Sequence, residues 1–172
     1  MLKKSNTSKI LSLLFKNPTT NYHIRQIAEL LKISPPTVLT AMKELKKNNL
    51  VTEKKTKVMT IITANTEYYT FKRKKRIFNL NILYESNIID FIINEYRYPQ
   101  AIILFGSFAR GEDIESSDID IAVITNKKKD LNLTMFENKL QRTINIHEID
   151  INKVSKEFKN NLYNGIVLEG AL

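Results

Sequence analysis

The sequence contains no cysteine and only four glycines among its 172 residues. The absence of cysteine excludes disulfide-bonded scaffolds, thiolate metal sites and cysteine nucleophiles. Average glycine usage near 7% would give about twelve glycines in a chain of this length, so each one that remains is informative about the backbone. Gly106 and Gly111 fall within six residues of each other, and this cluster predicts a segment of special backbone conformation.

Long hydrophobic runs are also missing. No apolar stretch approaches the 18 or so residues that a membrane span requires. The short apolar segment at residues 10–15 lacks a small-residue cleavage site, so we interpret it as a helix rather than as part of a signal peptide. The hydrophobic fraction of 42% is normal for a globular chain. We therefore expect a soluble, cytoplasmic protein that has no membrane partner.

Charge is distributed unevenly along the chain. Residues 1–78 hold 17 basic and 4 acidic side chains, whereas residues 79–172 hold 10 basic and 14 acidic ones. The first part is thus +13 and the second −4, for a total of +9. Such asymmetry is typical of a nucleic-acid-binding segment joined to a part with another task, although lysine-rich helices can also be merely solvated.

Helical periodicity dominates the basic part. Apolar residues recur at helical spacing over residues 10–14, 24–31 and 38–45, which predicts three helices. Ser34 suits the N-cap of the third helix. Pro35 suits its first position, because the missing N–H of proline has no intrahelical partner there.

A lysine-rich hairpin is predicted next, with strands at 50–52 and 58–63. The order of helix, helix, tight turn, helix and basic hairpin resembles the winged helix-turn-helix domains of prokaryotic regulators. The stretches that carry this resemblance over residues 8–63 are 24–31, 34–38 and 45–51. It implies a first domain over 1–65, followed by connecting helices over 66–98.

The resemblance implies that double-stranded DNA is a partner of this domain. The third helix would enter the major groove while the hairpin contacts phosphates. The residues expected at this interface are Thr37, Thr40, Lys43 and Lys47 on the helix and Lys54, Lys55 and Lys57 on the hairpin. Winged helices also serve as protein-docking or dimerising modules, and this alternative stays open.

The pattern changes after Pro99. Residues 101–105 form an apolar run of strand length, the glycine-bracketed turn follows, and a second strand is predicted over 118–124. Asp118 and Asp120 open that strand. Because residues i and i+2 of a strand point to the same side, the two carboxylates project together. Mutual repulsion of two such anions is relieved by a divalent cation, and carboxylate oxygens suit Mg²⁺.

The turn between the two strands is suited to phosphate. Backbone N–H groups at Gly106 and Ser107 form an anion cradle at the start of a helix, and Gly106 lets phosphate come close. Arg110, near the end of this short turn, is placed to hold a further phosphate. We also assign Ser117, directly before the carboxylate pair, to nucleotide binding.

The spacing of Gly106-Ser107 and Asp118-x-Asp120 resembles the signature of polymerase β-like nucleotidyltransferases. The fuller stretches, residues 104–112 and 117–123, are similar to the minimal branch of that superfamily. The resemblance implies an α+β protein, in which a mixed sheet flanked by helices spans residues 99–172. It also implies two Mg²⁺ ions, an NTP donor with ATP favoured, and transfer of NMP to a hydroxyl group.

The family uses a third carboxylate on a later strand. Residues 144–151 form the candidate strand, on which Glu148 and Asp150 share one face. We favour Asp150 as the third metal-binding and catalytic residue, because a helix then begins near Val154 where the family has one. Glu148 stays open as the alternative. His147 falls on the other face and is interpreted as a structural residue.

Three functions remain, and the first is favoured. Minimal nucleotidyltransferases often serve as antitoxins beside HEPN-type toxins, so the first is transfer of AMP to a HEPN-like partner protein, with the winged helix autoregulating the operon. The second is a DNA-binding transcriptional regulator whose nucleotidyltransferase domain only senses nucleotide. The complete set of candidate carboxylates argues against this second function. The third, transfer to a small hydroxyl compound, is disfavoured because only about twenty residues follow the strand at 144–151. A homodimer is a further expectation.

Overall fold

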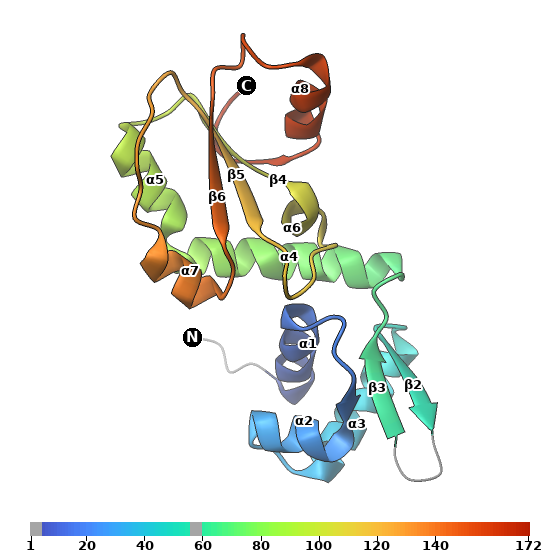
Figure 1. The fold of residues 1–172 in the computed structure, drawn as a ribbon. Coiled ribbons are helices and arrows are strands. Elements are labelled where there is room, and N and C mark those ends of the chain that lie inside the picture. Colours follow the sequence, from blue (N-terminus) through green and yellow to red (C-terminus); the bar gives the residue numbers. More distant parts are fainter. Residues whose placement is uncertain (1–4, 56–59) are drawn as a thin grey trace. The chain divides into compact units, whose positions relative to one another are not determined.

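The computed structural model describes residues 5–55 and 60–172 and divides the chain into two compact units, 1–75 and 76–172. Helices and strands occur in both units, with a three-stranded sheet in the first and a four-stranded sheet in the second (Figure 1). The α+β class predicted from the sequence is confirmed. No helix among the described residues is long and apolar enough to cross a membrane.

Three helices form most of the first unit. They are α1 (Asn6–Lys16), α2 (Ile24–Leu31) and α3 (Pro35–Lys47). The predicted cap of α3 is confirmed, because the Ser34 hydroxyl accepts a hydrogen bond from the Thr37 N–H and Pro35 occupies the first helical position. Lys32 has a φ of +52° at the end of α2, which closes the tight turn before α3.

The sheet of the first unit has strand order β1-β3-β2, all antiparallel. The bounds are Tyr22–His23 for β1, Val51–Lys55 for β2 and Thr60–Ala64 for β3. The two-residue β1 has no periodicity of its own and was not predicted. The turn of the predicted hairpin lies outside the described residues, and β2 runs further into the lysine-rich segment than predicted.

Helix α4 (Tyr69–Ser86) starts in the first unit and continues into the second. Its first turns bury Phe71, whose ring meets Phe15 of α1 edge-on with centroids 5.0 Å apart. Helix α5 (Ile88–Tyr96) follows directly. These two helices are the pair predicted over residues 66–98.

The second unit is built on a mixed sheet of order β6-β5-β4-β7. The strands are β4 (Ala101–Phe105), β5 (Ile119–Ile124), β6 (Ile144–Ile149) and β7 (Ile166–Gly170). Three short helices connect them, namely α6 (Gly106–Arg110), α7 (Thr134–Leu140) and α8 (Lys156–Tyr163). Strands β5 and β6 pair in parallel, while the other neighbours are antiparallel. Helix α7, which the sequence analysis did not predict, forms the crossover that parallel pairing requires.

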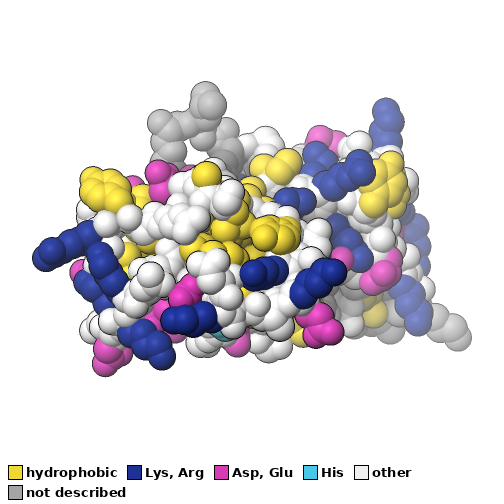
Figure 2. Space-filling model, turned by 90° about the horizontal axis from the view of Figure 1, so that it is seen from above, with side chains coloured by type: hydrophobic (Ala, Val, Ile, Leu, Met, Phe, Trp, Pro, Cys, Tyr) yellow, Lys and Arg dark blue, Asp and Glu magenta, His cyan; other side chains and the backbone are white. Residues whose placement is uncertain are grey.

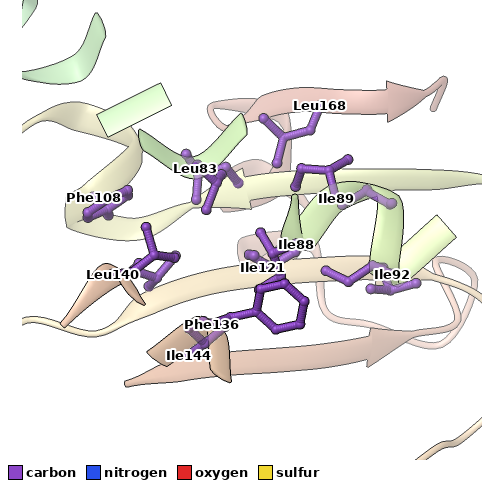
Figure 3. Packing of buried hydrophobic residues seen from close by; sticks show 14 of the residues in the cluster. Leu83, Ile88, Ile89, Ile92, Phe108, Ile121, Phe136, Leu140, Ile144 and Leu168 are labelled. Carbon is purple, nitrogen blue, oxygen red and sulfur yellow. The ribbon is translucent and has the colours of Figure 1, made fainter. Parts of the chain in front are cut away.

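Each face of this sheet buries a separate apolar cluster. The larger one joins α4, α5 and α7 to one face through residues such as Leu83, Ile92 and Phe136 (Figure 3). Ile119, Ile121 and Val123 of β5 point into it. The smaller cluster covers the opposite face, and Ala122, Ile124 and Ile149 belong to it. The side on which each polar strand residue lies follows from this alternation.

The surface mixes charges of both signs on the face that Figure 2 shows. Lysine and arginine side chains are spread around exposed hydrophobic residues, and acidic side chains lie between them. An arrangement of this kind is typical of a solvated surface rather than of a nucleic-acid footprint. The cations relevant to DNA are those of α3 and β2, described below.

Candidate functional site

Two carboxylates lie at the end of the second sheet where β5 begins. Asp118 directly precedes β5 and Asp120 is its second residue. Asn145 of β6 is the register partner of Asp120, and its amide nitrogen lies 3.3 Å from an oxygen of each carboxylate. The structure therefore brings the predicted pair together and adds an amide that donates to both members.

His147 lies on the same side of the sheet as Asp120. Its Nε2 is 3.3 Å from Asp120 Oδ1, and its ring packs edge-on against Phe105 with centroids 5.2 Å apart. Asp120, Asn145 and His147 alternate with the residues that enter the larger apolar cluster, which places all three on the other face. His147 lies on the face opposite Glu148, as predicted, but this face is the one that carries Asp120, so His147 is next to the acidic pair.

Gly106 packs against Asp120. It has a φ of +75°, and a Cβ atom built on it would lie 2.7 Å from Oδ2 of Asp120. Any side chain here would displace that carboxylate, and the positive φ would add strain. Gly106 was predicted to leave space for phosphate. It also leaves space for the Asp120 carboxylate beside the turn between β4 and α6.

The segment after Gly106 is held by buried polar contacts. Asn79 of α4 donates to the carbonyl of Phe108 at 2.9 Å and to Oδ1 of Asp113 at 2.7 Å, and both polar side chains are buried. The remaining predicted groups have local partners. Arg110 forms an exposed ion pair with Glu112 at 2.7 Å, and the Ser117 hydroxyl accepts from the Ile114 N–H.

The predicted third carboxylate lies elsewhere, and this expectation is corrected. Asp150 follows the last residue of β6, five residues beyond Asn145, which puts it about 16 Å along the strand from the pair. There it bonds Lys153 at 3.0 Å, and this contact, with the Asn152 N–H, lowers the pKa of the Asp150 carboxyl. It lines a separate cavity of about 260 Å³.

Glu148 is also outside the acidic site. It accepts a hydrogen bond from the Tyr96 hydroxyl at 2.7 Å, on the face opposite Asp120. Burial and the neighbouring carboxylate raise the pKa of Tyr96. Parallel pairing explains the position of Asp150, because the N-terminal end of β5 can adjoin only the N-terminal end of β6. The alternation of side chains along β6 explains the position of Glu148, which lies on the face opposite Asn145.

Comparison with protein-family models identifies both parts of the chain. Residues 86–172, just over half of the chain, match the model described as polymerase beta, nucleotidyltransferase. The chain belongs to the polymerase beta nucleotidyltransferase family. Residues 4–52 match the model described as winged helix-turn-helix DNA-binding, so the predicted fusion is confirmed. No match is found among curated proteins.

The nucleotidyltransferase domain has a polar cavity of about 360 Å³ beside Asp118. The residues that line it are Glu115, Ser116, Ser117, Asp118, Glu137, Asn138, Gln141, Arg142 and Thr143. Its walls thus come from the acidic segment before β5 and from the end of α7. This volume lies within the range of small-ligand sites and could receive part of a nucleotide or of an acceptor.

The donor set at Asp118 and Asp120 fits one Mg²⁺ ion. In residues 5–55 and 60–172, no group of three or more His, Cys, Asp or Glu side chains is arranged to hold a metal. Mg²⁺ commonly takes one or two protein carboxylates and completes its shell with phosphate and water. The pair meets that requirement for one ion and is one carboxylate short of the set predicted for two.

The winged helix of this family member exposes most of the predicted DNA-contacting residues. Thr40, Lys43 and Lys47 are exposed on α3, and Thr37 is half-buried beside the helix cap. Lys54 and Lys55 are exposed on β2, whereas Lys57 lies outside the described residues. Val38, Met42 and Leu45 face the core as predicted.

Replacing Lys43 by alanine should weaken binding to all DNA sequences alike. Loss of one phosphate contact reduces the slope of log affinity against log salt concentration by about 0.9. Fluorescence anisotropy with a labelled duplex at several salt concentrations measures that slope. Lys9→Ala, on the exposed side of α1, is the matched control and should leave the slope unchanged. Equal slopes for the two variants would show that Lys43 does not contact DNA phosphate.

Proposed function

We propose that this protein is a DNA-binding regulator whose nucleotidyltransferase domain binds an NTP with one Mg²⁺ ion. Asp118 and Asp120 would hold the ion, and Gly106 and Ser107 would receive the phosphates. The observation that carries the proposal is Asn145, an amide in the place beside Asp120 where a third carboxylate would complete a two-ion site.

Electrostatics supports binding of a nucleotide with its ion. Two carboxylates beside each other repel, and a divalent cation shared with phosphate oxygens offsets both charges. The turn at Gly106 lies against Asp120, so phosphate on the turn and the ion on the carboxylates would be neighbours. When bound, Mg²⁺ supplies charge neutralisation for the triphosphate. The protein's own contribution would be a pair of carboxylates beside the turn at Gly106.

The same arrangement supports regulation more than transfer. In two-ion transfer, a third carboxylate helps to position the ion that activates the attacking hydroxyl. Asn145 cannot accept a proton, and Glu148 and Asp150 lie away from the pair. A site of this composition would still bind Mg²⁺ and a nucleotide, but it lacks the third carboxylate of the two-ion reaction.

Transfer of AMP to a hydroxyl of a HEPN-like partner protein is the second candidate. It is favoured by the complete run of Gly106, Ser107, Asp118 and Asp120 and by the family membership. The polar cavity beside Asp118 offers space for an acceptor. In this candidate the winged helix would control transcription of the operon.

One set of measurements separates the two candidates. DNA affinity is measured with Mg²⁺ and each of ATP, GTP, CTP and UTP, in the full-length protein and in Asp120→Ala. If the protein is a regulator, one nucleotide should change the DNA affinity of the wild type at least fivefold. The same nucleotide should leave the DNA affinity of Asp120→Ala unchanged. The same nucleotide should raise the melting temperature of the wild type only, because ligand binding stabilises the folded state.

The second arm uses α-labelled NTP and the product of the neighbouring gene. Label on that product, lost in Asp118→Ala and Asp120→Ala, would favour transfer over regulation. Absence of both nucleotide-dependent stabilisation and label transfer would contradict both candidates. Asp150→Asn is the matched control, since its carboxylate is distant from the pair and the variant should behave as the wild type.

A further inference from the structure

The exposed side of α3 carries one large apolar side chain among hydroxyls and cations. Leu39 is 51% exposed, while Val38 and Met42 of the same helix are buried. A single exposed leucine is ordinary on a protein surface. Leu39, however, is the fifth residue of the helix whose N-terminal part meets base edges when helix-turn-helix proteins bind DNA.

Leu39 shares a stripe with two cations. Leu39, Lys43 and Lys46 follow one another at intervals of four and three residues, so they line one side of α3. Lys46 forms an ion pair with Glu53 of β2, which places this side of the helix next to the wing strand. If Lys43 approaches DNA phosphates, Leu39 approaches the same groove.

Hydrogen-bonding readers of A·T pairs are scarce on this helix. Residues 35–47 include no asparagine or glutamine, the side chains that form bidentate contacts with adenine, whereas their lysines can contact guanine in place of arginine. The Thr40 hydroxyl donates to the carbonyl of Pro36 at 3.1 Å, and Glu44 accepts from Thr7 at 2.7 Å. Apolar contact by Leu39 is therefore the main means by which the stripe can recognise an A·T pair.

We propose that Leu39 contacts the C5-methyl groups of thymines in the major groove and gives the winged helix a preference for thymine-containing sites. The major groove presents this methyl only at A·T pairs, which makes apolar contact a source of sequence specificity. The inference rests on DNA binding by the winged helix. It does not depend on what the nucleotidyltransferase domain does with a nucleotide.

Replacing thymine by uracil tests the contact, because uracil lacks only the methyl group. Duplexes are selected with the full-length protein from a pool with a randomised centre, and the tightest are remade with uracil in place of thymine. Wild-type affinity should fall about fourfold for each contacted methyl, as expected for one apolar group of that size. Leu39→Ala should bind the thymine and uracil duplexes equally.

Leu30→Ala is the matched control. Leu30 is 55% exposed on α2 and is not part of the α3 stripe, so this variant should keep the wild-type preference for thymine. If uracil changes the shape of the duplex, the resulting change in affinity is also seen with Leu39→Ala. It can then be subtracted from the change measured for the wild type.

Equal affinity of the wild type for thymine and uracil duplexes would overturn the proposal without any variant. Retention of the thymine preference by Leu39→Ala would also overturn it. A change in oligomeric state of Leu39→Ala, together with indifference of the wild type to uracil, would identify Leu39 as a protein contact instead. Failure of the wild type to bind any duplex at low salt would contradict DNA binding itself, and so the two failures are distinguishable.

Discussion

Replacing Asn145 by aspartate is expected to raise the affinity for Mg²⁺ or Mn²⁺ at least tenfold. The new carboxylate would stand where the amide now donates to Asp118 and Asp120 at 3.3 Å. Three carboxylates form a stronger ligand set than two, and a bound cation relieves their mutual repulsion. In chelator, the same variant should be less stable than the wild type by about 1–3 kcal/mol, because two charge-assisted hydrogen bonds are replaced by repulsion.

Calorimetric titration with Mn²⁺ and thermal melts with and without chelator measure both effects. Asn145→Ala, which removes the amide and adds no charge, separates loss of the donor from gain of a ligand. Glu148→Gln should leave cation affinity unchanged, because Glu148 lies on the opposite face of β6 and bonds Tyr96. Mn²⁺ binding by Asn145→Asp that is no tighter than in the wild type would contradict the proposed geometry of the site.

Replacing Asn79 by alanine should lower the free energy of unfolding of the second unit by about 3 kcal/mol. The change removes two hydrogen bonds that Asn79 donates inside the protein, one to the Phe108 carbonyl and one to the Asp113 carboxylate. Loss of a donor to a buried carboxylate is costly because the anion has little access to water. For a unit of this size the melting temperature should fall by more than 10 °C.

Asn81→Ala, two residues away on the exposed side of α4, is the matched control and should change stability by less than 0.5 kcal/mol. Urea unfolding followed by circular dichroism measures both variants in the full-length protein. Asn79→Ala should also weaken binding of Mg²⁺ and nucleotide, because it loosens the segment between Gly106 and Asp118. Similar stabilities for the two variants would show that the buried contacts contribute little.

Local signals predicted much of the fold. Ser34 and Pro35 marked the start of α3, because a hydroxyl acceptor and a residue without N–H suit those positions. The glycine cluster marked a turn in which Gly106 and Gly111 both have positive φ. Asp118 and Asp120 were correctly placed together, because that inference needed only the two-residue period of one strand.

The placement of β6 could not be obtained in this way. Its isoleucines at 144 and 146 enter one apolar cluster, while Ile149 enters the other, so periodicity did not show which face meets Asp120. The direction of pairing decides which end of β6 lies beside the acidic pair, and it is a tertiary property. Asp150 lies at the C-terminal end of β6. That end would lie beside Asp118 and Asp120 only if β6 paired antiparallel with β5.

One overlooked signal would have helped. Phe136 and Leu140 are four residues apart, and both are buried on α7. A helix between the strands at 119 and 144 indicates a β-α-β crossover, and hence parallel pairing. Asn145 then follows as the neighbour of Asp120. The contact of Asn79 with Asp113 spans 34 residues and has no comparable local signal.

The amide of Asn145 has a consequence for how the site is occupied. Because its amide nitrogen already lies against both carboxylates, part of their mutual repulsion is offset before any cation binds. Under the proposed function, nucleotide and Mg²⁺ could leave and return while the domain stays folded, so the fraction of loaded molecules would follow the free nucleotide concentration by mass action. A DNA-bound protein of this kind would respond to nucleotide concentration without consuming the nucleotide.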